Sequence, residues 1–343
     1  MLDAIIVAPG AQFPFDCAID AESAAAVWTW MARDLAPEVL GPLAANPETT
    51  AKELDAVLPE ILAEARAVVA EAAKDYETDR RLKLQLGGEA SAACLPAVLY
   101  ALKSRALIEK AQTFGRAVNN MTDDGGLAMA LQSMPLQDAK ASALLMQVAI
   151  GQIANPTRLV TNAVKIAGGT SEAALARAGF GPLIDAILSH AQNQIPVLRP
   201  VGVYADMDLI CRSIDRFHRL IRSVHGYVEF SRGTHWTAVI SGLTKAASEA
   251  IEPKLRQVVP DVVQSLRRPR EGADRLDEDK LLSALNGVYL LVTLRESRDS
   301  LALNASYEQA WSQTGQALET HLTRNLDIYR ENPADSMAPG RSP

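Results

Sequence analysis

Cysteine is scarce in this 343-residue chain. Its three cysteines, Cys17, Cys94 and Cys211, lie far apart and form no CxxC pair. A disulfide framework uses an even set of cysteines, and a structural zinc site uses closely spaced ligand pairs. Neither pattern is present, so reduced thiols in the cytosol are the simpler interpretation. The sequence predicts no metal site.

Aromatic residues are also few, at 5% of the chain, whereas alanine and leucine are abundant. Strands draw on aromatic and β-branched side chains, while alanine and leucine favour helices. With 48% hydrophobic and 22% charged residues, the composition is that of a globular protein. We therefore predict an all-α fold: a multi-helix, bundle-like protein with long antiparallel helical hairpins.

Long hydrophobic runs are absent as well. No stretch approaches the roughly 20 apolar residues that a membrane span needs. The opening MLDAIIVAPG lacks the basic start and the long apolar segment of a secretory signal. We expect a cytoplasmic protein with no membrane span.

Motifs of known catalytic sites are missing too. The sequence contains no GxSxG, GxGxxG or HExxH pattern. AGGTSEAALA, residues 167–176, has the glycines of a phosphate loop but neither its lysine nor its upstream strand. His190, His235 and His321 have no visible nucleophile to serve. We predict no cofactor, and an enzymatic function has no support, although dispersed residues could still converge in the fold.

Charge is unevenly distributed along the chain, whose formal net charge is −7. Residues 1–79 hold 15 acidic and four basic side chains, whereas residues 199–270 hold 12 basic and seven acidic ones. The two signs are interleaved in the basic part, so a solvated surface explains it better than a binding patch. The net negative charge argues against a nucleic-acid partner, whose binding would depend steeply on salt.

Proline and glycine mark the best candidate for a domain boundary. The stretch PVLRPVGV, residues 196–203, holds two prolines and a glycine. We therefore predict an N-terminal helical half over residues 1–197 and a C-terminal helical half with long hairpins over residues 198–331. Residues 332–343 are expected to form a disordered tail.

Apolar residues at alternating spacings of four and three mark the faces of several helices. An early stripe comprises Leu58, Leu62, Ala65, Val69, Ala72 and Tyr76. A later pair comprises first Ile210, Ile214, Phe217, Ile221, Val224 and Val228, and then Trp236, Ile240, Leu243, Ala247 and Ala250. Gly233 suits the end of the first helix of this pair, and Thr234 suits the start of the second. The pair predicts an antiparallel helical hairpin.

The chain from Leu281 to Arg330 contains no proline, and only Gly287 and Gly315 interrupt it. This stretch predicts one very long helix or two collinear helices. The last of its apolar stripes comprises Trp311, Gly315, Leu318, Leu322 and Tyr329.

A polar stripe lies beside the apolar stripe of residues 210–228, with members at Asp215, His218, Arg222, His225 and Glu229. His218 and His225 are seven residues apart, so they are separated by about 10.5 Å along a helix and cannot share one zinc ion. His225 and Glu229 could share one, but only with a third ligand from elsewhere. Most of the charge has a local partner four residues away, as in Asp208 with Arg212.

The functional alternative is an anion-binding site. Arginines can clamp a phosphate or a carboxylate through paired N–H donors. Such a site, for a small anionic or lipid-like ligand between helices, would be lined by Arg216, His218, Arg222, His225 and Arg298.

Arg298 falls on an apolar row with Leu294, Leu301 and Ala305. An unpaired buried guanidinium is costly. Either the helix breaks near Asn304 and Arg298 reaches water, or Arg298 ties the C-terminal helix to an acidic residue or binds an anion.

Two acidic pairs, Asp123 with Asp124 and Asp206 with Asp208, superficially resemble magnesium–diphosphate ligands. Each pair stands at an expected helix start, where carboxylates cap the helix and favour its dipole. We interpret both as helix caps.

Long apolar helix faces are the strongest signals in this sequence. They predict a scaffold, adaptor or regulatory protein that acts through helix-face contacts with a protein partner or with itself. The alternative is an enzyme or sensor that uses the anion site. In the first case an apolar helix face should be exposed; in the second the basic side chains should converge on one cavity.

Overall fold

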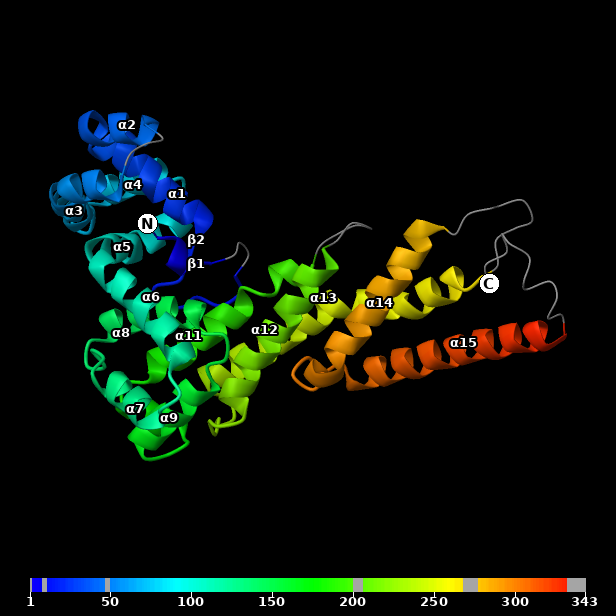
Figure 1. The fold of residues 1–343 in the computed structure, drawn as a ribbon. Helices are drawn as coiled ribbons and strands as arrows, with labels where there is room; N and C mark the ends of the chain where they lie inside the picture. Colours follow the sequence, from blue (N-terminus) through cyan, green and yellow to red (C-terminus); the bar gives the residue numbers. More distant parts are fainter. Residues whose placement is uncertain (1, 8–10, 47–49, 200–205, 268–276, 332–343) are drawn as a thin grey trace. The chain divides into compact units, whose positions relative to one another are not determined.

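The all-α prediction is confirmed by a computed structural model of the chain (Figure 1), which is 78% helical and has 15 α-helices among the residues that it describes. The structure describes residues 2–7, 11–46, 50–199, 206–267 and 277–331. Within these ranges the only strands are β1, Ile6–Val7, and β2, Ile19–Asp20, which pair in parallel with Ile6 opposite Ile19. The predicted disordered tail lies outside the described residues.

The contacts within the chain define two compact units. Unit 1 comprises Met1–Pro196 and Arg219–Ile240, and unit 2 comprises Val197–His218 and Ser241–Pro343. Two helices, α12 (Met207–His225) and α13 (His235–Ser265), therefore contribute residues to both units. The predicted domain limits at residues 197 and 198 stay a prediction.

Unit 1 holds the first 11 helices and the adjoining ends of α12 and α13. A π-helical segment, Met31–Leu35, follows the first helix directly. The 11 helices are α1 (Ala21–Trp30), α2 (Pro37–Ala45), α3 (Ala51–Ala72), α4 (Tyr76–Gln85), α5 (Glu89–Lys103), α6 (Arg105–Asn120), α7 (Asp124–Gln132), α8 (Ala139–Gln152), α9 (Thr157–Ala167), α10 (Glu172–Arg177) and α11 (Gly181–Gln192).

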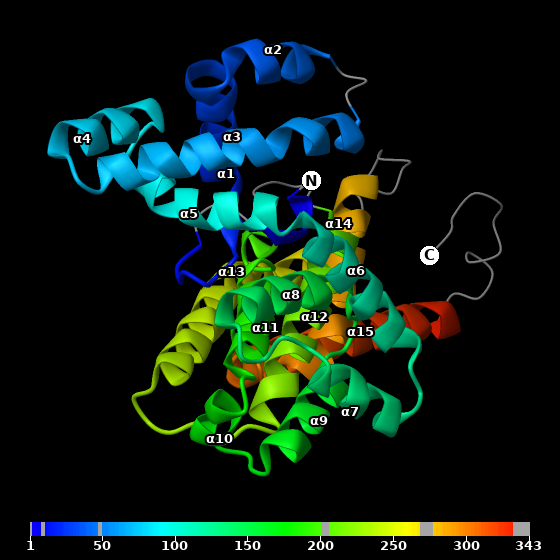
Figure 2. The same ribbon diagram turned by 90° about the vertical axis from the view of Figure 1, so that its left-hand side faces the viewer.

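Helix α8 is the centre of the unit 1 core. Every residue from Ser142 to Ile150 is buried, and the helix packs against α6 and α11 (Figure 2). Gly115 allows the close approach of α6, because a Cβ atom there would lie 2.5 Å from the Ala149 carbonyl oxygen. The Gln147 amide on α8 donates to the Ser189 hydroxyl on α11 over 3.1 Å. A second polar contact joins the same two helices, because His190 Nε2 of α11 lies 2.7 Å from the Gln147 carbonyl oxygen.

The early apolar stripe is confirmed through most of its length and wrong at its end. Leu58, Leu62, Ala65 and Ala72 are buried in α3, whereas Tyr76 is 75% exposed. The stripe stops because α3 ends at Ala72 and a new helix, α4, begins at Tyr76. The cause is local: the Asp75 carboxylate accepts a hydrogen bond from the Thr78 backbone N–H and caps α4.

Both stripes of the predicted hairpin are buried. Ile210, Ile214, Phe217, Ile221 and Val224 lie within α12, and Ile240, Leu243, Ala247 and Ala250 lie within α13; all nine are buried. The end of α12 and the start of α13 share unit 1, while the start of α12 and the body of α13 share unit 2. That division is what antiparallel packing of the two helices produces.

The predicted end of the first hairpin helix is wrong. Helix α12 ends at His225, not near Gly233. The chain beyond it adopts an extended conformation in which the Glu229 N–H donates to the Thr170 carbonyl over 2.9 Å. Gly233 then turns the chain with a φ of +79°. A long-range backbone contact therefore replaces the last helical turns.

The prediction of one long helix or two collinear helices after Leu281 is also wrong. Helix α14, Glu278–Ser297, and helix α15, Asn304–Glu331, are separated by a turn and contact each other. Ala302 has a φ of +50°, and the Leu303 N–H donates to the Arg298 carbonyl over 3.0 Å. Leu301 and Leu303 are buried, so the turn is stabilised by apolar burial rather than by glycine or proline.

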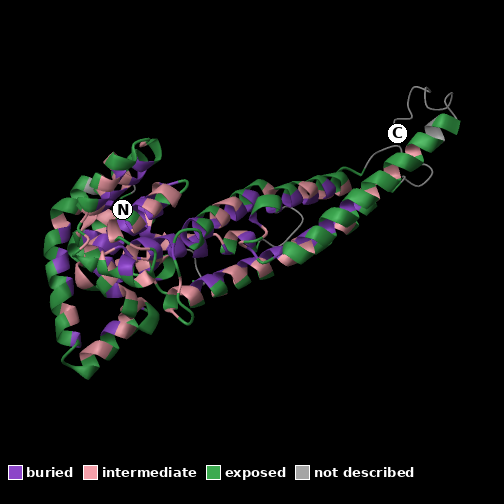
Figure 3. Ribbon diagram, turned by 90° about the horizontal axis from the view of Figure 1, so that it is seen from below, coloured by how far each residue is buried: buried purple, intermediate pink, exposed green. Residues whose placement is uncertain are grey.

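The predicted apolar stripe of α15 is exposed. Trp311, Leu318 and Leu322 are 44–61% exposed. Helix α15 instead buries Tyr307, Ala310 and Thr314. Most of the helix beyond them is exposed (Figure 3). The side chain of Tyr329 lies outside the described residues.

Candidate functional site

The five residues of the predicted anion site divide between the two units. Arg222 and His225 belong to unit 1, whereas Arg216, His218 and Arg298 belong to unit 2. In unit 1 both side chains are exposed, and the His225 ring lies 5.9 Å from the Phe230 ring. In unit 2 the other three are half-buried.

His218 and Arg298 both contact the turn between α14 and α15. His218 Nδ1 lies 2.9 Å from the hydroxyl of Ser300 within that turn. The Arg298 guanidinium lies 3.5 Å from the Glu308 carboxylate and 4.9 Å from the centre of the Tyr307 ring. Both interpretations of Arg298 are met in part: the helix breaks before Asn304 and the Arg298 side chain is 33% exposed, and its guanidinium also pairs with an acidic residue of the C-terminal helix. A cation–π contact on Tyr307 adds to it.

Local pairing along the polar stripe is present where the helix continues. Arg212 forms an ion pair with Asp208 one turn earlier. His225 and Glu229, which a continuous helix would place one turn apart, do not share a helix, because α12 ends at His225. Together with the exposed positions of Arg222 and His225, these contacts fit a solvated helix face.

One member of each acidic pair, Asp123 or Asp206, caps a helix as predicted, whereas Asp124 and Asp208 form ion pairs. The Asp123 carboxylate accepts hydrogen bonds from the N–H groups of Gly125 and Gly126 at the start of α7, over 3.0 and 2.7 Å. Asp206 accepts from the Leu209 N–H in the same way at α12. Asp124 instead pairs with Arg158, and that hydrogen bond lowers the pKa of Asp124. Across the described parts of the chain, no group of three or more metal-ligating side chains comes together.

A half-buried carboxyl that sequence reasoning missed, that of Asp185, lies in unit 1. The indole N–H of Trp236 donates to Asp185 on α11 over 2.7 Å. Burial raises the pKa of Asp185, and the Trp236 hydrogen bond only partly opposes this effect. The signal in the sequence is a lone carboxylate within the apolar run PLIDAIL. The hydrogen bond joins α11 to the start of α13.

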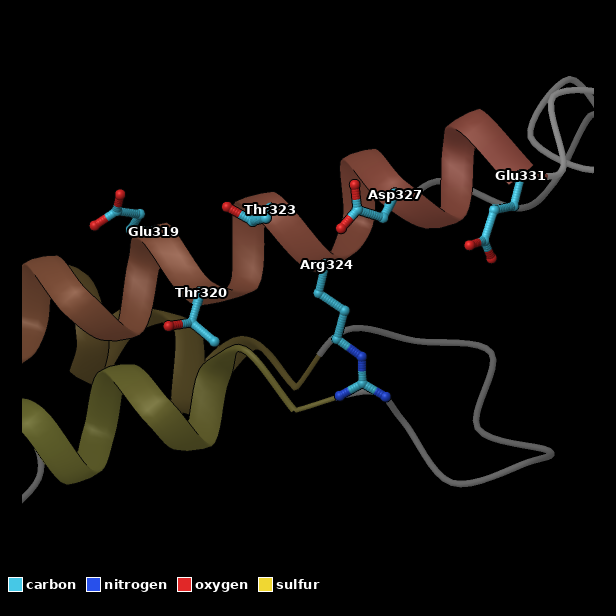
Figure 4. Close-up of a pocket in the computed structure, with 6 residues that line it drawn as sticks. All are labelled: Glu319, Thr320, Thr323, Arg324, Asp327 and Glu331. Atoms are coloured by element: carbon cyan, nitrogen blue, oxygen red, sulfur yellow. The ribbon is translucent and has the colours of Figure 1, made fainter.

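The surface hollow drawn in Figure 4 lies along α15 in unit 2. Its lining side chains all come from this one helix, and none belongs to the predicted anion site. In Figure 4 Arg324 points away from the carboxylates of Glu319 and Asp327. A hollow with a single helix as its wall does not enclose a small ligand. The lining residues are Glu319, Thr320, Thr323, Arg324, Asp327 and Glu331.

Besides the exposed stripe of α15, a second exposed apolar surface lies on α14. Four side chains at spacings of three, four and three form one face of this helix and are 45–58% exposed. We call Leu282, Leu285, Tyr289 and Val292 the α14 face. Its neighbour Leu281 is 40% exposed, and Leu209 of α12, within the same unit, is 50% exposed. Contiguous apolar surface of this kind marks a contact site rather than ordinary surface.

Sequence reasoning missed the α14 face because α14 is apolar on nearly all sides. Such a helix is normally buried throughout. Its other side is indeed buried: Gly287 lies so close to α13 that a Cβ atom there would be 3.1 Å from the Val258 side chain. The α14 face could have been predicted from the width of the apolar surface of α14. That surface is wider than one neighbouring helix can cover.

Comparison with known proteins adds no relative: no family model matches the chain, and neither does any curated protein or solved structure. The class that the fold defines is therefore an all-α, multi-helix protein. Within the described residues no single helix is long and apolar enough to cross a membrane. Helices α5 and α6 pass that test only together, and they are bent by 75°.

Proposed function

We propose that this protein is a scaffold, adaptor or regulator that binds a protein partner through an exposed helix face, the α14 face. The support is a single observation: four apolar side chains in helical register, each about half exposed, on a helix whose opposite side is packed in the core of unit 2. Burial of each remaining half would contribute about 1 kcal/mol to binding. The four side chains together would contribute about 4 kcal/mol, so a stable complex also needs contacts around the α14 face.

The proposal includes a cytoplasmic location. Its support is that the three cysteines are unpaired in the structure and that Cys17 and Cys211 are buried, as in proteins of a reducing compartment.

The enzyme or sensor alternative has less support. Arg298, one of its five ligands, is paired with Glu308, and His218 is bonded to Ser300. Arg222 and His225 are exposed on a helix surface. An anion site would need these side chains to line one cavity.

The test is affinity capture with the full chain as bait, in the wild type and in the double variant Leu285→Glu/Tyr289→Glu. We expect the wild type to retain partners that the double variant loses, because two buried carboxylates oppose an apolar contact. The matched control is Leu84→Glu, which places the same charge on a 72% exposed leucine of α4. Identical partners for all three proteins would refute the proposal, and circular dichroism checks that each variant is folded.

A further inference from the structure

We propose that the partner of the α14 face is a cationic amphipathic helix, with a lysine or arginine at each end of its apolar stripe. This inference rests on the proposed function, because it names the chemistry that the same surface recognises. It follows from the charges that bound the face.

Two carboxylates lie in line with the α14 face. Glu278 precedes Leu282 by four residues and Glu296 follows Val292 by four, so helical periodicity places both on the same side of α14. Both are exposed, and neither forms an ion pair within the described part of the chain. The two are 18 residues apart, a distance of about 27 Å along a helix.

The acidic bias extends beyond these two residues. Asp279 and Asp299, at the two ends of α14, are also exposed and have no ion-pair partner among the described residues. Arg295 is the one exposed basic residue of the last turn, and Lys280 of the first turn is paired with Asp277. The rim of the face therefore favours a positively charged partner.

Helix stability does not explain all of these charges. Carboxylates in the first turn of a helix, such as Glu278, favour its dipole, but a carboxylate in the last turn opposes it. Glu296 occupies that last turn. A cationic partner would be attracted to both ends, whereas a second copy of this chain would place the same carboxylates opposite one another in either a parallel or an antiparallel pair.

The geometry also fits a helix better than an extended peptide. The apolar side chains fall at residues 282, 285, 289 and 292, which is the periodicity that an opposing helix with the same spacing matches. The Tyr289 hydroxyl donates to Asp208 of α12 over 3.4 Å.

The test uses two synthetic 20-residue helical peptides with leucines at spacings of three, four and three. One peptide has lysine at both ends of the stripe and the other has glutamate. Fluorescence anisotropy with the full chain measures both dissociation constants. We expect the lysine peptide to bind about tenfold more tightly, because the carboxylates at the two ends of the face attract its lysines and repel the glutamates of the other peptide. Added salt should reduce this difference.

Charge reversal supplies the second arm. The variant Glu278→Lys/Glu296→Lys should bind the glutamate peptide more tightly than the lysine peptide. Leu285→Glu should weaken the binding of both peptides. The control Leu84→Glu should bind both as the wild type does. Equal binding of both peptides, or no binding of either, overturns the inference and leaves the proposed function to its own capture experiment. Dimerisation by light scattering that Leu285→Glu abolishes also overturns it, because a second copy then covers the face. Binding to uncharged phosphatidylcholine vesicles that Leu285→Glu abolishes overturns it in favour of a lipid surface.

Discussion

Helices α8 and α14 are alike in sequence and different in their surroundings. Both are apolar on nearly every side. In α8 every residue from Ser142 to Ile150 is buried by neighbouring helices of unit 1, whereas in α14 Leu282, Leu285, Tyr289 and Val292 are exposed. A helix that is apolar on all sides is therefore expected to pack against other segments on all sides. Its sequence does not tell whether those segments belong to the same chain or to a partner.

The largest expected effect is on the free energy of unfolding when a leucine is replaced by alanine, and it should differ between α8 and α14. Leu144→Ala in α8 should lower the free energy of unfolding by about 2–5 kcal/mol, because it removes a fully buried side chain and leaves a cavity. Leu285→Ala in α14 should change it by about 0.5 kcal/mol or less, because that side chain is 58% exposed. Urea denaturation measures both. A large loss for Leu285→Ala would mean that the α14 face is covered within the chain.

Replacing a glycine by alanine should give the next largest change in the free energy of unfolding. The change should have opposite signs in the two units. Gly115→Ala should destabilise unit 1 by about 1–3 kcal/mol, because its Cβ would overlap the Ala149 carbonyl and force α6 away from α8. Gly315→Ala on α15 meets nothing within 4 Å and should stabilise the helix by about 0.5–1 kcal/mol. Thermal denaturation followed by circular dichroism compares them. Equal effects would contradict the packing described for α6 and α8.

A smaller effect concerns the turn between α14 and α15. Arg298→Ala should cost about 1 kcal/mol, because it removes the contacts with Tyr307 and Glu308. Arg295→Ala, three residues earlier and exposed, is the matched control and should have almost no effect. Urea denaturation is again the measurement. If both variants lose the same stability, Arg298 does not anchor the turn.

The smallest effect is a pH dependence with opposite signs at two carboxyls. The pKa of Asp185 is raised by burial, so its stabilising protonated form is fully present below about pH 4 and is lost as pH rises through that raised pKa. Asp185→Asn should therefore be more stable than the wild type at neutral pH and equal to it in acid. Asparagine keeps an oxygen to accept from Trp236.

Asp124 provides the contrast. Its pKa is lowered by the hydrogen bond from Arg158, so its stabilisation is present above about pH 4 and is lost as pH falls through the lowered pKa. Asp124→Asn should be less stable than the wild type at neutral pH, and the difference should shrink in acid. Thermal denaturation from pH 3 to pH 8 checks both variants, and curves of the same sign would contradict these assignments.

Local features of the fold could be predicted from the sequence. The helix caps at Asp123 and Asp206 follow from carboxylates at helix starts, and the buried stripes of α12 and α13 follow from spacings of three and four. Such features depend on residues within a few positions of one another, so periodicity and side-chain chemistry are enough to find them.

The candidate site could be predicted only in kind. An exposed apolar helix face was expected, but no helix was named for it: the stripe of Trp311 and Leu322 is exposed, and the α14 face was not predicted. Arg298 was correctly recognised as a charge that needs a partner, but Glu308 could not be named as that partner. The turn that brings the two together contains no glycine or proline, so nothing in the sequence indicated it.

The sequence by itself determined that this protein is helical, where several of its helices begin, and which of their faces are apolar, because these properties depend on neighbours in the chain. Only the tertiary structure decided that α12 stops at His225, that Asp185 is half-buried with a raised pKa, and that α8 is enclosed while α14 is not. The physical reason is that burial depends on which distant segments come close, and hydrophobicity alone is the same for a covered and an uncovered helix.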